Sequence, residues 1–154
     1  MPEESKKNTE VIQRGLDALT IADDSEAGVT VCYGTDLLVS MHALQTRSKV
    51  LLYGDTIDRS ISIPLTEEFV MRSKVLPSSK ILKHATTNAA KLLGLQGKVG
   101  VLMPGAFADL IVLDANSLED IAILDDPNKH LYAVIKQGHV FRSRLQTLQV
   151  DVAY

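Results

Sequence analysis

Several residue types that would point to a particular function are scarce in this 154-residue sequence. Tryptophan is absent and aromatic residues make up 5%, so the chain offers no aromatic surface on which bases or sugars would stack. The single cysteine, Cys32, excludes an intrachain disulfide. Its apolar neighbours indicate a buried thiol, and a reducing cytoplasmic setting is the expected localisation.

Long apolar runs and basic clusters are also missing. The N-terminus is polar and lacks the apolar core of a signal peptide, and the longest apolar stretches are far shorter than a membrane span. The 16 basic and 19 acidic residues give a net charge of −3, without a Lys/Arg cluster. We therefore expect neither nucleic acid nor a membrane as a partner, and a composition with 45% hydrophobic residues is typical of a globular protein.

The first half of the chain combines helical and extended patterns. Apolar residues at helical spacing between Val11 and Ile21 predict a helix that ends in the acidic run 23–26. The β-branched run 29–33 predicts a buried strand, with Asp36 just beyond its carboxyl end, where α/β proteins bind ligands.

Two further helices are predicted in the middle of the chain. One begins at residues 66–67 and is broken by Pro77. The next has Ser78 or Ser79 as its expected cap, places its apolar residues on one side, and ends at Gly94.

The second half of the chain changes to the period of strands after residue 97. Residues 108–114 predict a strand that is buried on both faces. Residues 132–136 and 139–141 predict a hairpin, in which Gly138 at the second loop position favours a primed turn. The tail 146–154 is expected to be loosely ordered.

Three stretches in this order resemble the amidohydrolase superfamily, in particular its prolidase-like and imidazolonepropionase-like branch. They are 27–36, then 81–95 with its Ala-Thr-x-Asn-Ala-Ala-x-x-Leu-Gly-Leu pattern, and 97–138. The resemblance implies an α/β fold that is part of a TIM-type (β/α)8 barrel and not a complete one. Residues 1–95 would be the C-terminal part of the barrel, and 96–145 would be strands of the family's composite β-sandwich, followed by the tail.

The resemblance also implies chemistry for Asp36. It would bind a divalent metal, zinc, and accept a proton from the metal-bound water that attacks the substrate. The residues alone leave open that Asp36 only caps the following turn or helix. His42, six residues later, would reach substrate from the loop, or would be an exposed loop histidine. Residues 47–66 have no counterpart in the family pattern and would be either an insertion near the loop over that site or an artefact of the gene model.

The metal ligands that the family needs are largely missing from this sequence. It contains four histidines and no His-x-His pair, whereas zinc takes three or four protein ligands. We therefore expect that the chain does not hold the metal stably by itself. The remaining polar residues are assigned packing, strand-end or backbone-bonding roles: His84, Thr86, Thr87, Asn88, Asp109, Asp114, His130 and His139.

Three functions compete at this point. The first is part of a metal-dependent hydrolase that cleaves C–N bonds in small amide or dipeptide-like substrates, with a separate segment supplying the histidines and this chain inactive alone. The second is a non-catalytic remnant that binds a partner or self-associates through exposed barrel edges. The third is a free-standing α/β domain that unfolds as a monomer. An incomplete barrel loses partner surface for its apolar faces, so we expect a marginally stable or associating chain.

Overall fold

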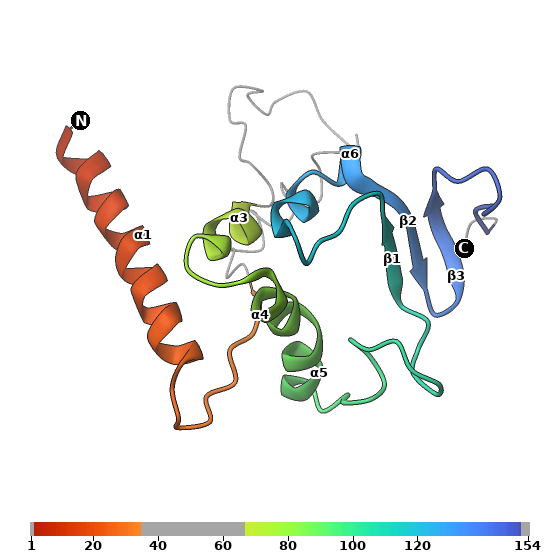
Figure 1. Ribbon diagram of the computed structural model, residues 1–154, viewed down its shortest axis with the longest axis horizontal. Helices are drawn as coiled ribbons and strands as arrows, with labels where there is room; N and C mark the ends of the chain where they lie inside the picture. Colours follow the sequence, from red (N-terminus) through yellow and green to blue (C-terminus); the bar gives the residue numbers. More distant parts are fainter. Residues whose placement is uncertain (1, 35–66, 152–154) are drawn as a thin grey trace, which may run out of the picture.

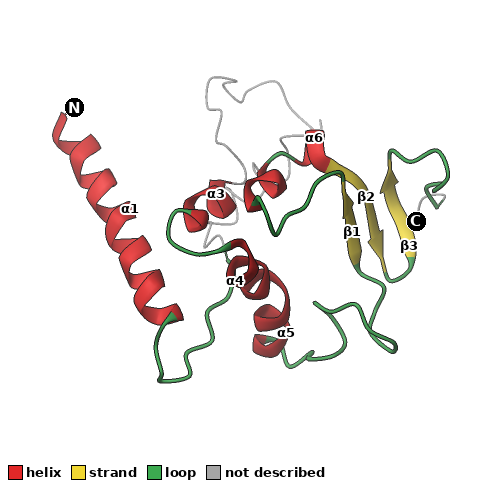
Figure 2. Ribbon diagram, in the orientation of Figure 1, coloured by secondary structure: helices red, strands yellow, loops and turns green. Residues whose placement is uncertain are grey.

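The computed structural model describes residues 2–34 and 67–151 (Figure 1). Figure 2 shows helices on one side of the described part and a small sheet on the other. In chain order the elements are α1 (Pro2–Asp23), α3 (Glu67–Ser73), α4 (Ser78–Lys83), the π-helix η1 (His84–Asn88), α5 (Ala89–Leu92), β1 (Leu110–Leu113), the 3-10 helix η2 (Ile121–Asp125), α6 (Pro127–His130), β2 (Leu131–Lys136) and β3 (His139–Ser143).

The predicted first helix is confirmed, and α1 ends at Asp23 as the acidic run indicated. Its outer face carries i,i+4 pairs that support the helix, such as Arg14 with Glu10 at 2.6 Å. Only its C-terminal end reaches the rest of the described part, where Leu19 packs on the core (Figure 1). The apolar stripe farther out is exposed, with 62% of Val11 accessible.

The strand predicted at 29–33 is not formed in the described part of the chain, where this segment is extended but pairs with no strand. The helical layer satisfies its backbone instead. The Tyr33 N–H donates to the His84 carbonyl at 3.0 Å, and Asn88 Nδ2 donates to the Val31 carbonyl at 2.7 Å. Cys32 is half-buried, so the prediction of a fully buried thiol is wrong.

One long helical stretch runs from α4 through η1 to α5, as the apolar pattern predicted. The helix break at Pro77 is confirmed, but Pro77 itself is the N-cap and Ser78 is already helical, so the expected serine cap is wrong. The end at Gly94 is confirmed. Its φ of 68° lets the Leu95 N–H donate back to the Ala90 carbonyl at 2.8 Å.

A π-turn interrupts this helix at η1 and was not predicted. The Thr86 hydroxyl donates to the Leu82 carbonyl at 2.6 Å, which confirms the expected backbone bonding of these polar helical residues. Gly100 lies directly against the π-turn. A Cβ built on Gly100 would stand 2.7 Å from the Thr86 carbonyl oxygen, so only glycine fits there.

The sheet is antiparallel with the order β1-β2-β3. The predicted hairpin is confirmed, since Gln137 and Gly138 both have positive φ, as a primed two-residue turn requires. The prediction that β1 is buried on both faces is wrong, because Ile111, on one face of the strand, is 51% exposed. The described residues thus form helices beside a three-stranded antiparallel sheet and not a closed barrel.

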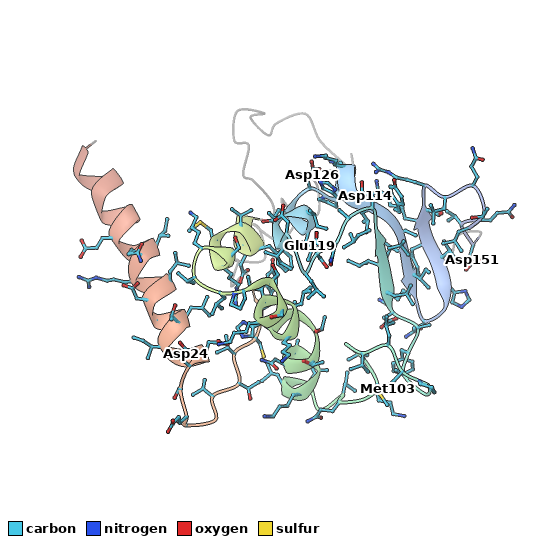
Figure 3. The ribbon with its side chains drawn as sticks, in the orientation of Figure 1. Asp24, Met103, Asp114, Glu119, Asp126 and Asp151 are labelled. Atoms are coloured by element: carbon cyan, nitrogen blue, oxygen red, sulfur yellow. The ribbon has the colours of Figure 1, made fainter. Side chains whose placement is uncertain are left out.

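The first part of the tail is held against β3, contrary to the loose order expected. The Asp151 N–H donates to the Val140 carbonyl at 3.0 Å, and the Val140 N–H donates to Asp151 Oδ2 at 2.7 Å. Figure 3 shows Asp151 beside β3. This pairing covers one edge of the sheet, as edge strands generally require.

The buried core lies between the helices and η2. Leu76, Ile81 and Ile121 form its centre, and partly buried apolar residues from α1, α3 and η2 surround it. Asp125 of η2 accepts from the Val70 N–H of α3 at 2.9 Å and so ties the two elements together. The core therefore fixes α3 and α4 beside the extended segment 29–34.

Candidate functional site

The two site residues predicted from the sequence, Asp36 and His42, lie outside the described residues, as does the stretch 47–66. Their predicted roles stay predictions. The described backbone leads toward Asp36 through Cys32, Tyr33 and Gly34. The geometry of the site is therefore built from the side chains that surround these residues.

Arg72 of α3 makes the contacts that hold this end of the segment. Its Nε and Nη2 donate to Glu68 Oε1 at 2.8 and 2.5 Å, which fixes the guanidinium one turn along the same helix. Nη2 also donates to the Cys32 carbonyl at 3.3 Å, and the guanidinium carbon lies 5.3 Å from the centre of the Tyr33 ring. The Arg72 side chain is only 12% exposed, so these contacts are largely shielded from water.

His84 connects Arg72 to the end of α1. The ring is 2% exposed, with Nδ1 at 3.4 Å from Arg72 Nη1 and Nε2 at 2.7 Å from Asp23 Oδ1. An arginine only donates, so Nδ1 accepts and the hydrogen of the ring lies on Nε2, facing the Asp23 carboxylate. This arrangement confirms the packing role that the sequence assigned to His84.

Asp23 is the second buried ionisable group here, with a side chain 9% exposed. Burial raises the pKa of Asp23, but hydrogen bonds from Lys80 and His84 and the positive charge of Lys80 outweigh it, so the pKa lies below the ordinary value. Asp23 Oδ2 makes no hydrogen bond of ordinary geometry, and the Lys80 ammonium lies 2.5 Å from it. Lys80 also bonds to Asp24, whose place at the end of α1 is labelled in Figure 3.

Tyr33 is held between two side chains of α3. Its ring stacks on Phe69 with centroids 4.5 Å apart, and Arg72 approaches the ring as well. Burial and the charges of Glu68 and Asp125 raise the pKa of the Tyr33 phenol to about 12, although Arg72 acts in the opposite direction. The phenol therefore stays protonated at neutral pH and is not a general base.

No group of three metal-ligating side chains exists among the described side chains of residues 10–34 and 67–151. The buried pair Asp23 and His84 does not fit a metal, because Lys80 and Arg72 already occupy the positions around it. The described side chains therefore support no step that runs through a metal.

The remaining predicted polar residues have structural partners, as expected. His130 Nδ1 bonds to Asp114 Oδ1 at 2.7 Å, which places both at the junction of α6 with the sheet (Figure 3). Asp109 accepts from the Gln137 N–H at 2.7 Å and supports the hairpin turn. His139 lies 3.4 Å from Asp151.

Sequence reasoning did not single out Arg72, Glu68, Asp23 or Lys80. The spacing of Glu68 and Arg72 by four residues on a predicted helix is a visible signal for an ion pair. It does not show that the pair faces Cys32, which is 40 residues away in the sequence. Only the packing of α3 against the extended segment brings them together.

Comparison with known proteins gives one family. The model of the amidohydrolase family matches residues 5–141. The chain is 30% identical over 137 residues to a 5-methylthioadenosine/S-adenosylhomocysteine deaminase of Syntrophobacter fumaroxidans, covering 82% of this chain and 29% of that relative. It is 43% identical over 81 residues to an imidazolonepropionase of Chloroflexus aggregans, covering 53% and 19%.

A solved structure shows the same similarity in three dimensions. A prolidase crystallised with N-methylphosphonate-L-proline superposes with a TM-score of 0.67 at 34% identity, over 94% of this chain and 30% of that one. The chain thus spans less than a third of the length of each of these proteins.

Proposed function

The chain belongs to the amidohydrolase family, and from this premise we propose that it forms part of a metal-dependent hydrolase that cleaves C–N bonds in small amide or dipeptide-like substrates. Membership confirms the resemblance seen in the sequence and implies a TIM-barrel-type fold for such an enzyme. The observation that carries the proposal is the similarity to the solved prolidase, because it extends over 94% of this chain.

In this proposal Asp36 is the catalytic and metal-binding residue. A carboxylate next to a divalent cation stays ionised, and the cation lowers the pKa of bound water so that it attacks at neutral pH. The family resemblance supports zinc as the metal, and the position of His42 six residues after Asp36 suggests a substrate contact. The other ligands would come from a separate segment, because the described residues offer no further set. The chain alone would then be inactive.

A second function is supported by the apolar surface that the described elements expose. Val11 and Ile21 of α1 are 62% and 72% exposed, and Phe141 of β3 is 59% exposed. Faces of this kind are common at protein interfaces. The alternative proposal is a non-catalytic chain that self-associates or binds a partner through these faces.

Complementation tests the first proposal. The prolidase would be expressed without the 30% that this chain matches, and the full chain would be added as a second polypeptide with zinc. Hydrolysis of N-acyl-proline substrates that requires the chain and is lost with Asp36→Asn would support the proposal. A stable complex without hydrolysis would favour the non-catalytic alternative. Self-association of the chain alone, measured by sedimentation, tests that alternative directly.

A further inference from the structure

The feature that the proposed function leaves unassigned is a polar network with a buried centre, which ends on the Cys32–Tyr33 peptide. Its members come from the end of α1, from α3, and from the helical stretch α4–η1. They are connected in the order Lys80, Asp23, His84, Arg72 and Glu68. We call these five side chains the Arg72 network.

The Arg72 network is poor evidence of a purely stabilising role. Asp23, His84 and Arg72 are 9%, 2% and 12% exposed, and removing such groups from water costs much of what their pairing returns. Apolar residues of similar volume generally stabilise a core as well or better. The backbone that the Arg72 network holds, the Cys32–Tyr33 peptide, therefore indicates its role.

We propose that Arg72 is a positioning residue, which fixes the Cys32–Tyr33 peptide and so sets the direction in which the backbone enters Gly34. The inference rests on the proposed function, in which Asp36 follows shortly after. Three contacts carry it. Arg72 donates to the Cys32 carbonyl, its guanidinium approaches the Tyr33 ring, and the Tyr33 N–H donates to the His84 carbonyl.

We call these three contacts the clamp. The Arg72 network makes the clamp rigid because each member of the network is bonded to the next. Glu68 accepts two hydrogen bonds from Arg72, and His84 Nδ1 faces Arg72 only while Nε2–H donates to Asp23. The guanidinium fork serves Glu68, His84 and Cys32 in three directions at once. A lysine ammonium on a flexible stem carries the same charge but cannot reproduce this fork.

Thiol labelling of the full chain tests the clamp, because Cys32 is the only cysteine. Arg72→Gln is compared with Arg14→Gln, which removes another arginine that pairs with a glutamate four residues earlier, but on the exposed face of α1. Loss of the clamp should speed labelling of native Cys32 about tenfold or more, since a charge-assisted hydrogen bond to its peptide is lost. Arg14→Gln should stay within about twofold of the unaltered chain.

Two further variants separate positioning from general stability. Gly138→Ala strains the turn between β2 and β3, which lies away from Cys32, so the labelling rate of this variant should follow its urea midpoint. Arg72→Gln should label faster than its own urea midpoint predicts. Arg72→Lys should behave like Arg72→Gln. Equal labelling of Arg72→Gln and Arg14→Gln, or wild-type labelling of Arg72→Lys, would overturn the inference.

The complemented prolidase gives a second readout. If Arg72 only positions the backbone, Arg72→Gln should lower kcat about tenfold or more and leave KM nearly unchanged. Unchanged kcat would overturn the inference even where labelling changes. If the unaltered chain restores no hydrolysis, the proposed function fails, and with it the catalytic part of the inference, while the labelling result still shows whether Arg72 holds the peptide.

Discussion

Replacing Gly100 by alanine should destabilise the chain far more than the same change at Gly97. The two glycines have nearly the same left-handed backbone, with φ of 72° and 73°. A Cβ at Gly97 meets nothing within 4 Å, whereas at Gly100 it would lie 2.7 and 2.8 Å from the Thr86 carbonyl oxygen and carbon. The pair therefore separates a steric clash from backbone strain.

The magnitudes follow from these two contributions. A left-handed alanine costs about 1 kcal/mol relative to glycine, and both variants bear this cost. Overpacking against backbone adds about 1–3 kcal/mol at Gly100 alone. The atoms that the alanine methyl would meet are the backbone carbonyl of Thr86, in the middle of a π-turn. They cannot rotate away as the end of a long side chain would.

Urea unfolding followed by far-UV circular dichroism measures both variants against the unaltered chain. We expect Gly97→Ala to lose about 1 kcal/mol and Gly100→Ala about 2–4 kcal/mol, at an unchanged slope. Equal midpoints for the two variants would refute the close approach of the 97–100 loop to η1. Equal midpoints would also mean that no steric contact requires glycine at position 100.

Three other perturbations have defined outcomes. Because the folded pKa of Asp23 is depressed below its unfolded value, its contribution to stability is present above about pH 4 and is lost as pH falls through the folded pKa. Asp23→Asn should therefore flatten acid unfolding curves in that range, and unaltered curves would contradict this. Asp151→Ala should lower the free energy of unfolding by about 1 kcal/mol and speed hydrogen exchange at the Val140 amide, which donates to Asp151. Exchange at the Gln137 amide, which donates to Asp109, should stay unchanged and serves as the reference. Ile12→Ser should weaken self-association measured by sedimentation, since Ile12 is 50% exposed, and unchanged association would exclude the α1 stripe as the contact.

The sequence determined the local elements wherever a residue type restricts the backbone. Pro77 is the N-cap of the stretch α4–α5, Gly94 ends that stretch, and Gly138 makes a primed turn, because each depends on backbone angles that few residues adopt. The family could also be predicted, because the motifs of 81–95 and 97–138 are contiguous in the sequence.

The sequence did not determine which elements pair or what covers them. The β-branched run 29–33 has the composition of a strand, but in the described residues its carbonyls are bonded by Arg72 and Asn88. Ile111 belongs to an apolar run that indicated burial, and its exposure depends on what the fold packs against its face of the sheet. The predicted division of the chain near residue 95 and the roles of Asp36 and His42 stay predictions.

Only the tertiary structure decided which polar groups contact each other across long stretches of sequence. Arg72 bonds to the Cys32 carbonyl, 40 residues away, and His84 bonds to Asp23, 61 residues away. Periodicity describes a residue relative to its own helix or strand, so it cannot reveal which partner a buried charge finds. The sequence by itself determined the family and most local turns, whereas the packing of α1, α3 and η1 around one extended segment determined the Arg72 network.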